Sequence, residues 1–167
     1  MQGKAKRLTF LGLAAAVALI LSYVEMLLPP ILTAVPGIKI GLPNIVIIFL
    51  LYRFGIKDAA AVSVVRLAAV TLLFGNPVML IYSAAGAALS LALMVLCKKC
   101  GLFSAVGVSI VGGVMHNLGQ ILVAMLLLET AEIGYYMIVL AVSGTVAGIF
   151  IGLCGVALLK TMKNVRF

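Results

Sequence analysis

The sequence of 167 residues is poor in the side chains that carry most enzyme chemistry. It has no tryptophan, one histidine, three cysteines and four acidic residues, of which Asp58 is the single aspartate. Paired carboxylates for metal-assisted catalysis cannot be assembled convincingly from one aspartate. The chain also lacks a Ser/His/Asp arrangement, an HExxH motif and a glycine-rich phosphate loop ending in Gly-Lys-Ser/Thr. We therefore expect neither catalysis nor ATP hydrolysis by this chain itself.

The three cysteines, Cys97, Cys100 and Cys154, do not form a disulfide framework. They fall near the end of the protein that we assign to the cytoplasm, where thiols stay reduced. Cys97 and Cys100 have CxxC spacing, but a zinc site needs two more ligands and none is evident. We expect no bound metal.

Charge is scarce, since only 10% of the residues are charged and 65% are apolar. A soluble domain of this size would need far more polar surface. A helix that spans a bilayer needs about 20 mostly apolar residues, so six such helices would occupy most of the chain. The composition therefore predicts one membrane domain over residues 1–167, an all-α bundle of six transmembrane helices.

Turn signals divide the chain into six apolar segments. Pro29 and Pro30 end the first, and Gly75, Asn76 and Pro77 separate the third from the fourth. The first segment is longer than the apolar core of a signal peptide, about 7–15 residues, so we expect it to be retained. The second segment is short for a full span. The predicted helices are 8–28, 41–54, 56–74, 77–97, 102–128 and 134–159.

The basic residues predict the topology. The net charge of +8 does not take the form of a basic stripe with interleaved aromatics, so we expect no nucleic-acid partner. With the N-terminus inside, one basic residue, Lys39, falls on the outer side. This positive-inside bias favours six helices with both termini in the cytoplasm. The ten basic residues on the cytoplasmic side are Lys4, Lys6, Arg7, Arg53, Lys57, Lys98, Lys99, Lys160, Lys163 and Arg166.

Two predicted helices carry polar side chains at membrane depth, where such groups are costly. Arg66 lies midway along 56–74 and is either a buried partner of Glu25 or of helix carbonyls, or the receptor for an anionic ligand. In 102–128, a spacing of 100° per residue gathers polar groups and glycines on one face. This face either makes interhelical hydrogen bonds or lines a binding site. It consists of Ser109, Gly112, Gly113, His116, Gly119 and Gln120, with Asn117 at its edge.

Small residues form stripes on two other helices. Ala14, Ala18 and Ser22 share one face of the first helix, which either packs inside this protein or docks onto another membrane protein. The last helix carries a second stripe that we interpret as a packing seam. It consists of Ala141, Gly144, Gly148, Gly152 and Gly155.

Three segments, Pro36 to Ile45, Arg66 to Asn76 and Ser109 to Gln120, resemble a bacterial membrane family. It is the family called heptaprenyl diphosphate synthase component I, or Gx transporter family, and it is similar to the S components of energy-coupling-factor transporters. The resemblance implies a subunit in the bacterial cytoplasmic membrane that binds a small, vitamin-like, isoprenoid-related or anionic compound. It would bind no cofactor directly and would use ATP only through partner ATPases.

The same resemblance implies which residues take part. Ala14 and Ala18 would contact the coupling transmembrane subunit, and residues 29–43 would form a gating loop. The basic and polar groups would hold an anionic or carbonyl-rich ligand. The predicted pocket is lined by Lys39, Asn44, Arg66, Asn76, His116, Asn117 and Gln120.

A second hypothesis is a membrane anchor for a soluble prenyl diphosphate synthase in quinone or isoprenoid synthesis. Such synthases hold magnesium and diphosphate with aspartate-rich motifs, so a chain with one aspartate could at most accompany one. The docking surface would then comprise Lys98, Lys99, Lys160, Lys163 and Arg166. A small channel or proton-linked carrier is a weaker third reading, because the chain shows no inverted repeat.

Overall fold

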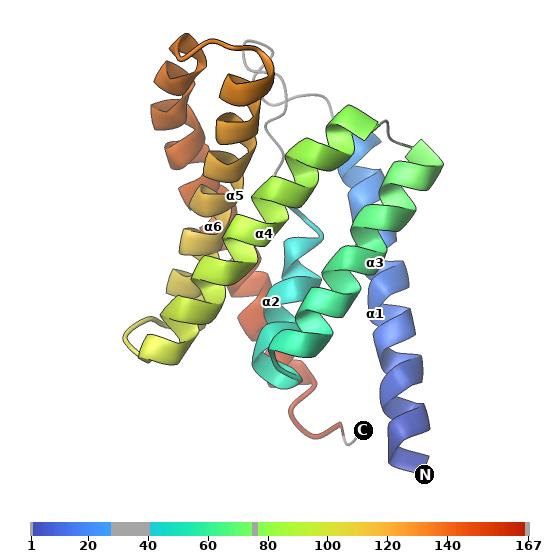
Figure 1. The fold of residues 1–167 in the computed structure, drawn as a ribbon. Coiled ribbons are helices and arrows are strands. Elements are labelled where there is room, and N and C mark those ends of the chain that lie inside the picture. The colour runs from blue at the N-terminus through green and yellow to red at the C-terminus, as the bar shows by residue number, and fades with distance from the viewer. Residues whose placement is uncertain (1, 28–40, 75–76, 166–167) are drawn as a thin grey trace.

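A computed structural model of the chain describes residues 2–27, 41–74 and 77–165, and this part of the chain is helical. The first three helices are α1 (Gln2–Leu27), α2 (Asn44–Arg53) and α3 (Ile56–Phe74). They are followed by α4 (Pro77–Cys100), α5 (Ala105–Leu127), a short 3-10 helix η1 (Glu132–Tyr136) and α6 (Met137–Thr161). The six predicted helices are therefore confirmed as helices, with ends that shift by a few residues (Figure 1).

Four stretches of helix are long and apolar enough to cross a membrane: Gly3–Leu27, Leu80–Cys100, Ala105–Leu127 and Glu132–Thr161. These four make the chain a membrane protein by length and composition. The prediction of six spans thus holds for four helices. α3 has 19 residues but also contains Lys57, Asp58 and Arg66, and α2 has only 10 residues.

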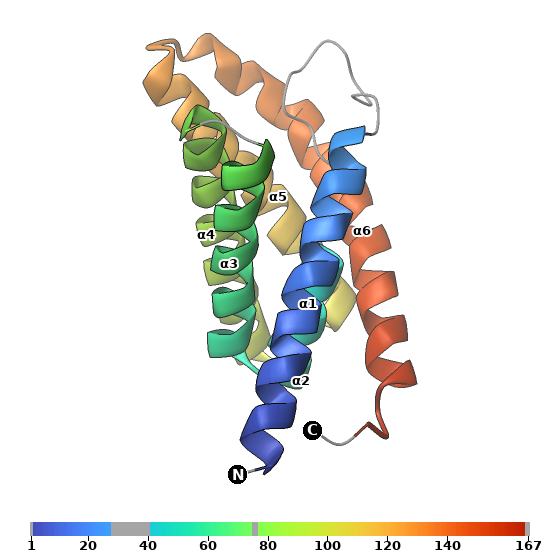
Figure 2. The same ribbon diagram turned by 90° about the vertical axis from the view of Figure 1, so that its right-hand side faces the viewer.

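The predicted second helix, 41–54, is shorter in the structure, where α2 has ten residues. Ten helical residues extend about 15 Å, half of the roughly 30 Å of a bilayer's hydrocarbon core. The helix begins only at Asn44, and six consecutive residues, Val46 to Leu51, are buried. A short helix with irregular backbone before it is tolerated at membrane depth when protein surrounds it. Both ribbon views place α2 among the longer helices (Figures 1 and 2).

Glycines let α5 pack closely against α4 on one side and α6 on the other. A methyl group on Gly119 would lie 2.8 Å from the carbonyl oxygen of Ala85 in α4. One on Gly148 in α6 would lie 2.5 Å from the Cα of Ile110 in α5. Gly113 and Gly144 face each other across the same α5–α6 contact. The predicted glycine seam of the last helix is therefore a backbone-to-backbone contact, of the kind that drives helix association in lipid.

Basic side chains close the C-terminal end of α2, where backbone carbonyls lack partners within the helix. Lys98 of α4 donates to the carbonyl oxygen of Leu51 at 2.6 Å, and its ammonium lies 4.8 Å from the centre of the Tyr52 ring. Arg53 donates to the carbonyl oxygen of Val165 at 2.6 Å. Lys98 and Arg53 thus hold α2 to α4 and to the segment after α6.

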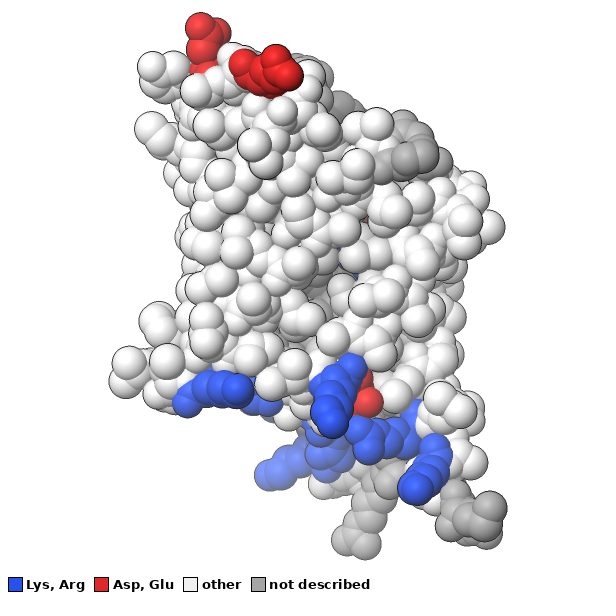
Figure 3. All heavy atoms as spheres, viewed as in Figure 1, with Lys and Arg blue, Asp and Glu red and all other residues white. Residues whose placement is uncertain are grey.

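Charge separates along the long axis of the molecule. Lysines and arginines gather at the end where both termini lie, and acidic side chains lie at the opposite end (Figures 1 and 3). At the basic end, Arg7 of α1 pairs with Asp58 of α3 at 2.5 Å. Among the described basic residues, Arg66 is the exception, because it lies midway along α3.

The α5–α6 seam predicts a large cost for a single added methyl group. In Gly148→Ala, the new Cβ would meet backbone rather than a movable side chain, so the helices must separate. We expect a loss of about 1–3 kcal/mol, as for other overpacked sites, measured by thermal unfolding in detergent. Gly12→Ala in α1 is the control, because nothing lies within 4 Å of its added Cβ. Equal stability of the two variants would contradict the close backbone contact between α5 and α6.

Candidate pocket at membrane depth

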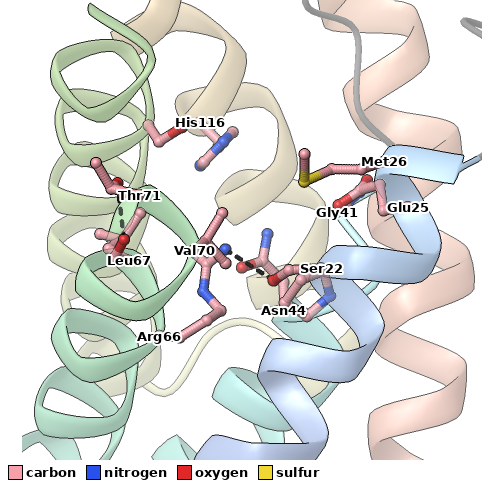
Figure 4. A pocket seen from close by; sticks show the side chains of 12 residues that line it. Ser22, Glu25, Met26, Gly41, Asn44, Arg66, Leu67, Val70, Thr71 and His116 are labelled. Carbon is pink, nitrogen blue, oxygen red and sulfur yellow. Dashed lines mark hydrogen bonds between the residues drawn. The ribbon is translucent and has the colours of Figure 1, made fainter. Parts of the chain in front are cut away.

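A pocket lies between α1, α3, α4 and α5, next to the N-terminal end of α2 (Figure 4). It encloses about 660 Å³ including its open mouth, and its inner part is much smaller. The pocket therefore fits a compact polar group in this conformation. Its lining comprises Ser22, Glu25, Met26, Gly41, Pro43, Asn44, Arg66, Leu67, Val70, Thr71, Ser83 and His116.

The α1 wall contributes Ser22 and Glu25, which are three residues apart and so share one helix face. The hydroxyl of Ser22 donates to the carbonyl oxygen of Ala18 at 2.8 Å. The Glu25 carboxylate accepts a hydrogen bond from the backbone N–H of Gly41. Gly41 has φ of 80°, a left-handed conformation that glycine adopts without steric cost. Glu25 therefore holds the turn that leads into α2.

Arg66 supplies positive charge to the pocket from α3. Its Nη1 donates to Ser22 Oγ over a long 3.4 Å, and its Nε is buried without a hydrogen-bond partner among the described residues. A guanidinium carries five N–H donors, and a buried donor without a partner costs about 1–3 kcal/mol. Figure 4 shows the side chain between α3 and α1, near Asn44 and Ser22. The arrangement can accept an anionic or carbonyl oxygen.

His116 lines the pocket from α5, and a glycine on α4 makes room for it. A methyl group on Gly86 would lie 3.0 Å from His116 Cε1 and 2.8 Å from the His116 carbonyl oxygen. The close approach of α4 and α5 at this point brings the ring to the pocket wall (Figure 4). His116 thus faces the pocket because α4 and α5 pack closely at Gly86.

The structure brings together three of the predicted pocket residues, Asn44, Arg66 and His116. The predicted residues Lys39 and Asn76 lie outside the described residues. Whether any of these side chains binds a ligand stays a prediction.

The two other predicted pocket residues are not among its lining. Asn117 is buried and donates to the carbonyl oxygen of Leu140 at 2.8 Å, so it joins α5 to α6. Gln120 lies against α4, where its Cγ would be 3.1 Å from a methyl group on Gly86. Asn117 therefore makes an interhelical hydrogen bond, and a ligand contact of either residue stays a prediction. A 100° helical spacing gives the direction of a side chain but not the helix that it meets.

The residues with polar or charged side chains that line the pocket outside the predicted set are Ser22, Glu25, Thr71 and Ser83. The sequence predicts Glu25 only as a structural partner of Arg66, and both residues line the same pocket. Ser83 belongs to a stripe on α4 with Gly86 and Ser90 at spacings of three and four, which faces α5. That spacing can be read from the sequence, and it could have identified Ser83 as a residue that faces α5.

Ala14 and Ala18 lie inside the protein. They are 7% and 0% exposed and belong to the core that surrounds α2. A partner could reach them only if α1 moved, so the partner contact stays a prediction. Within the described residues, no three histidine, cysteine or acidic side chains are grouped so that they could hold a metal ion.

The comparison with family models assigns the chain to a protein family. Residues 14–158 match the model described as heptaprenyl diphosphate synthase component I. The chain belongs to this family. The match spans α1 to α6 and therefore includes every wall of the pocket. No curated protein and no solved structure matches the chain significantly.

The bond between α5 and α6 gives a testable prediction for Asn117. Asn117→Ala removes the donor to Leu140, and we expect a loss of about 0.6–2 kcal/mol in a denaturant titration in detergent. Thr161→Val is the control, because its exposed hydroxyl bonds only within its own helix, to Ala157. A stability of Asn117→Ala equal to that of the unmodified protein would contradict an interhelical role.

Proposed function

We propose that this chain is a non-catalytic membrane subunit that acts beside a soluble prenyl diphosphate synthase at the bacterial cytoplasmic membrane. The family match over residues 14–158 carries the proposal, because its description is that of a synthase component. The subunit would hold the synthase close to the lipid in which a long prenyl chain dissolves.

The shortage of acidic residues supports a role without catalysis. Prenyl diphosphate synthases use clustered aspartates to hold magnesium and diphosphate, whereas this chain has Asp58 alone. The Asp58 carboxylate pairs with Arg7 where α1 and α3 begin. The metal-dependent step would therefore belong to the partner enzyme.

The charge separation supports the orientation that this role needs. Cytoplasmic ends of membrane proteins are enriched in lysine and arginine, so the basic end would face the cytoplasm with both termini. In this arrangement α3 would complete the bundle with its charged residues Lys57 and Asp58 at the cytoplasmic end. α2 would lie within the protein rather than cross the bilayer.

The docking surface for the synthase would comprise Lys99, Lys160 and Lys163, which are exposed at the basic end. Of the other two residues predicted for this surface, Lys98 has a half-buried ammonium that is bonded to Leu51 of α2, and Arg166 lies outside the described residues. The three exposed lysines would attract an acidic face of the partner.

The pocket favours a second candidate, a substrate-binding subunit of an uptake transporter. Arg66, Asn44 and His116 converge on one recess at membrane depth, as expected of a site for a small polar or anionic compound. In that role the coupling subunit and ATPases would be separate proteins, and ATP would act only through them.

Affinity purification from native membranes tests the proposal. We expect the tagged chain to recover a prenyl diphosphate synthase, and the combined change Lys99→Gln, Lys160→Gln and Lys163→Gln to lower recovery at least fivefold. The matched control, Glu129→Gln with Glu132→Gln, changes charge at the opposite end and leaves recovery unchanged. Cys100 carries an exposed thiol, and a membrane-impermeant thiol reagent reports on which side of the membrane it lies. Variants that keep their orientation give the same labelling as the unmodified chain.

One outcome would reject the synthase role, and another would reject only the docking surface. Recovery of ATPase and coupling subunits instead of a synthase would favour the transporter candidate. Equal recovery of the synthase by the lysine variants and the unmodified chain would reject the proposed docking surface.

A further inference from the structure

The pocket lies on the flank of the molecule rather than at one of its charged ends. Its walls include Leu67 and Val70 of α3 and Ser83 of α4, two helices that follow one another in the chain. The face in Figure 3, which is the view of Figure 1, is hollowed near mid-height between the acidic and basic ends. A ligand could therefore enter sideways, from the bilayer.

The inner part of the pocket suits a compact anion. Arg66 places a guanidinium there, with a buried Nε that makes no hydrogen bond to described residues and an Nη1 that makes one long contact. Charge–charge attraction is strong in surroundings with little water, and guanidinium geometry matches phosphate oxygens. Glu25 also lines the pocket, and its carboxylate accepts the Gly41 N–H and faces the same guanidinium, so a bound anion would share Arg66 with Glu25.

The small inner space of the pocket leaves the bilayer as the place for a long hydrocarbon chain. The apolar lining residues Met26, Leu67 and Val70 would contact the first carbons of a chain that leaves the pocket. The outer face of α3 continues this apolar surface, since Val64 is 64% and Leu72 86% exposed.

We propose that the pocket binds the phosphate or diphosphate head group of an amphipathic ligand whose hydrocarbon chain stays in the bilayer. This inference deepens the proposed function and rests on it for the prenyl nature of the chain. Arg66 contacts the phosphate oxygens, and Asn44 and Ser83 donate further hydrogen bonds. A subunit of this kind receives the head group of a prenyl diphosphate from the membrane side of the synthase.

Binding to the purified chain in nanodiscs of neutral lipid, without any synthase, tests this assignment. The probe is farnesyl diphosphate, compared with farnesol (chain alone), inorganic diphosphate (head group alone) and phosphatidic acid (phosphate on a different lipid). We expect farnesyl diphosphate to bind at least tenfold more tightly than farnesol or inorganic diphosphate. Weaker competition by phosphatidic acid assigns the site to prenyl ligands, whereas equal competition overturns the prenyl assignment.

Two variants and one control locate the bound ligand. Arg66→Gln removes the guanidinium, and Ser83→Leu fills the α4 side of the pocket without changing charge; each lowers affinity at least tenfold. Lys57→Gln is the matched control, because it removes an exposed positive charge from the same helix, and its affinity stays unchanged. Size-exclusion profiles and unfolding temperatures verify that the variants fold.

The outcomes separate this inference from the proposed function. Unchanged affinity in a folded Arg66→Gln or Ser83→Leu variant overturns the pocket assignment, and so does equal binding of inorganic diphosphate and farnesyl diphosphate. Recovery of a synthase together with no prenyl binding leaves the anchor role intact and rejects the inference. Prenyl binding without recovery of a synthase supports the head-group site and rejects the anchor role.

Discussion

The rest of the structure depends on the burial of a helix that is too short to cross a membrane. The first turn of α2 brings backbone N–H groups without helical partners to membrane depth, where water is scarce. Protein must therefore surround this end. Glu25 holds the Gly41 N–H just before it, while Lys98 bonds to the Leu51 carbonyl near the other end, which lies among the basic residues. The longer helices surround α2 and so keep it away from lipid.

That constraint also places the pocket. The chain turns at Gly41 to enter α2, and this turn lies beside Glu25 of α1 and opposite Arg66 of α3. α4, α5 and α6 pack so closely through glycines that little room is left between them. The open space therefore lies where this group of three meets α1, α3 and the start of α2. A charged side chain at that depth is costly without a role, and Arg66 retains a buried Nε without a partner among the described residues.

The helices were predictable because apolar runs and turn residues report on local structure. Proline, glycine and asparagine marked the boundaries, and the predicted 56–74 agrees with α3. The number of spans was not predictable in the same way, since residues 41–54 are apolar whether they face lipid or protein. The polar face of α5 shows the same limit. His116 reaches the pocket, whereas Asn117, the next residue, bonds to Leu140 of α6.

The sequence by itself determined a helical membrane protein with a basic end and an arginine at membrane depth, because hydropathy and charge act along the chain. Only the tertiary structure decided which polar groups meet. Ala14 and Ala18 became core because α2 and α3 pack against α1, and Ser22 and Ser83 became pocket walls because α1, α3, α4 and α5 enclose one space. These outcomes depend on how helices distant in the chain pack, which no single segment encodes.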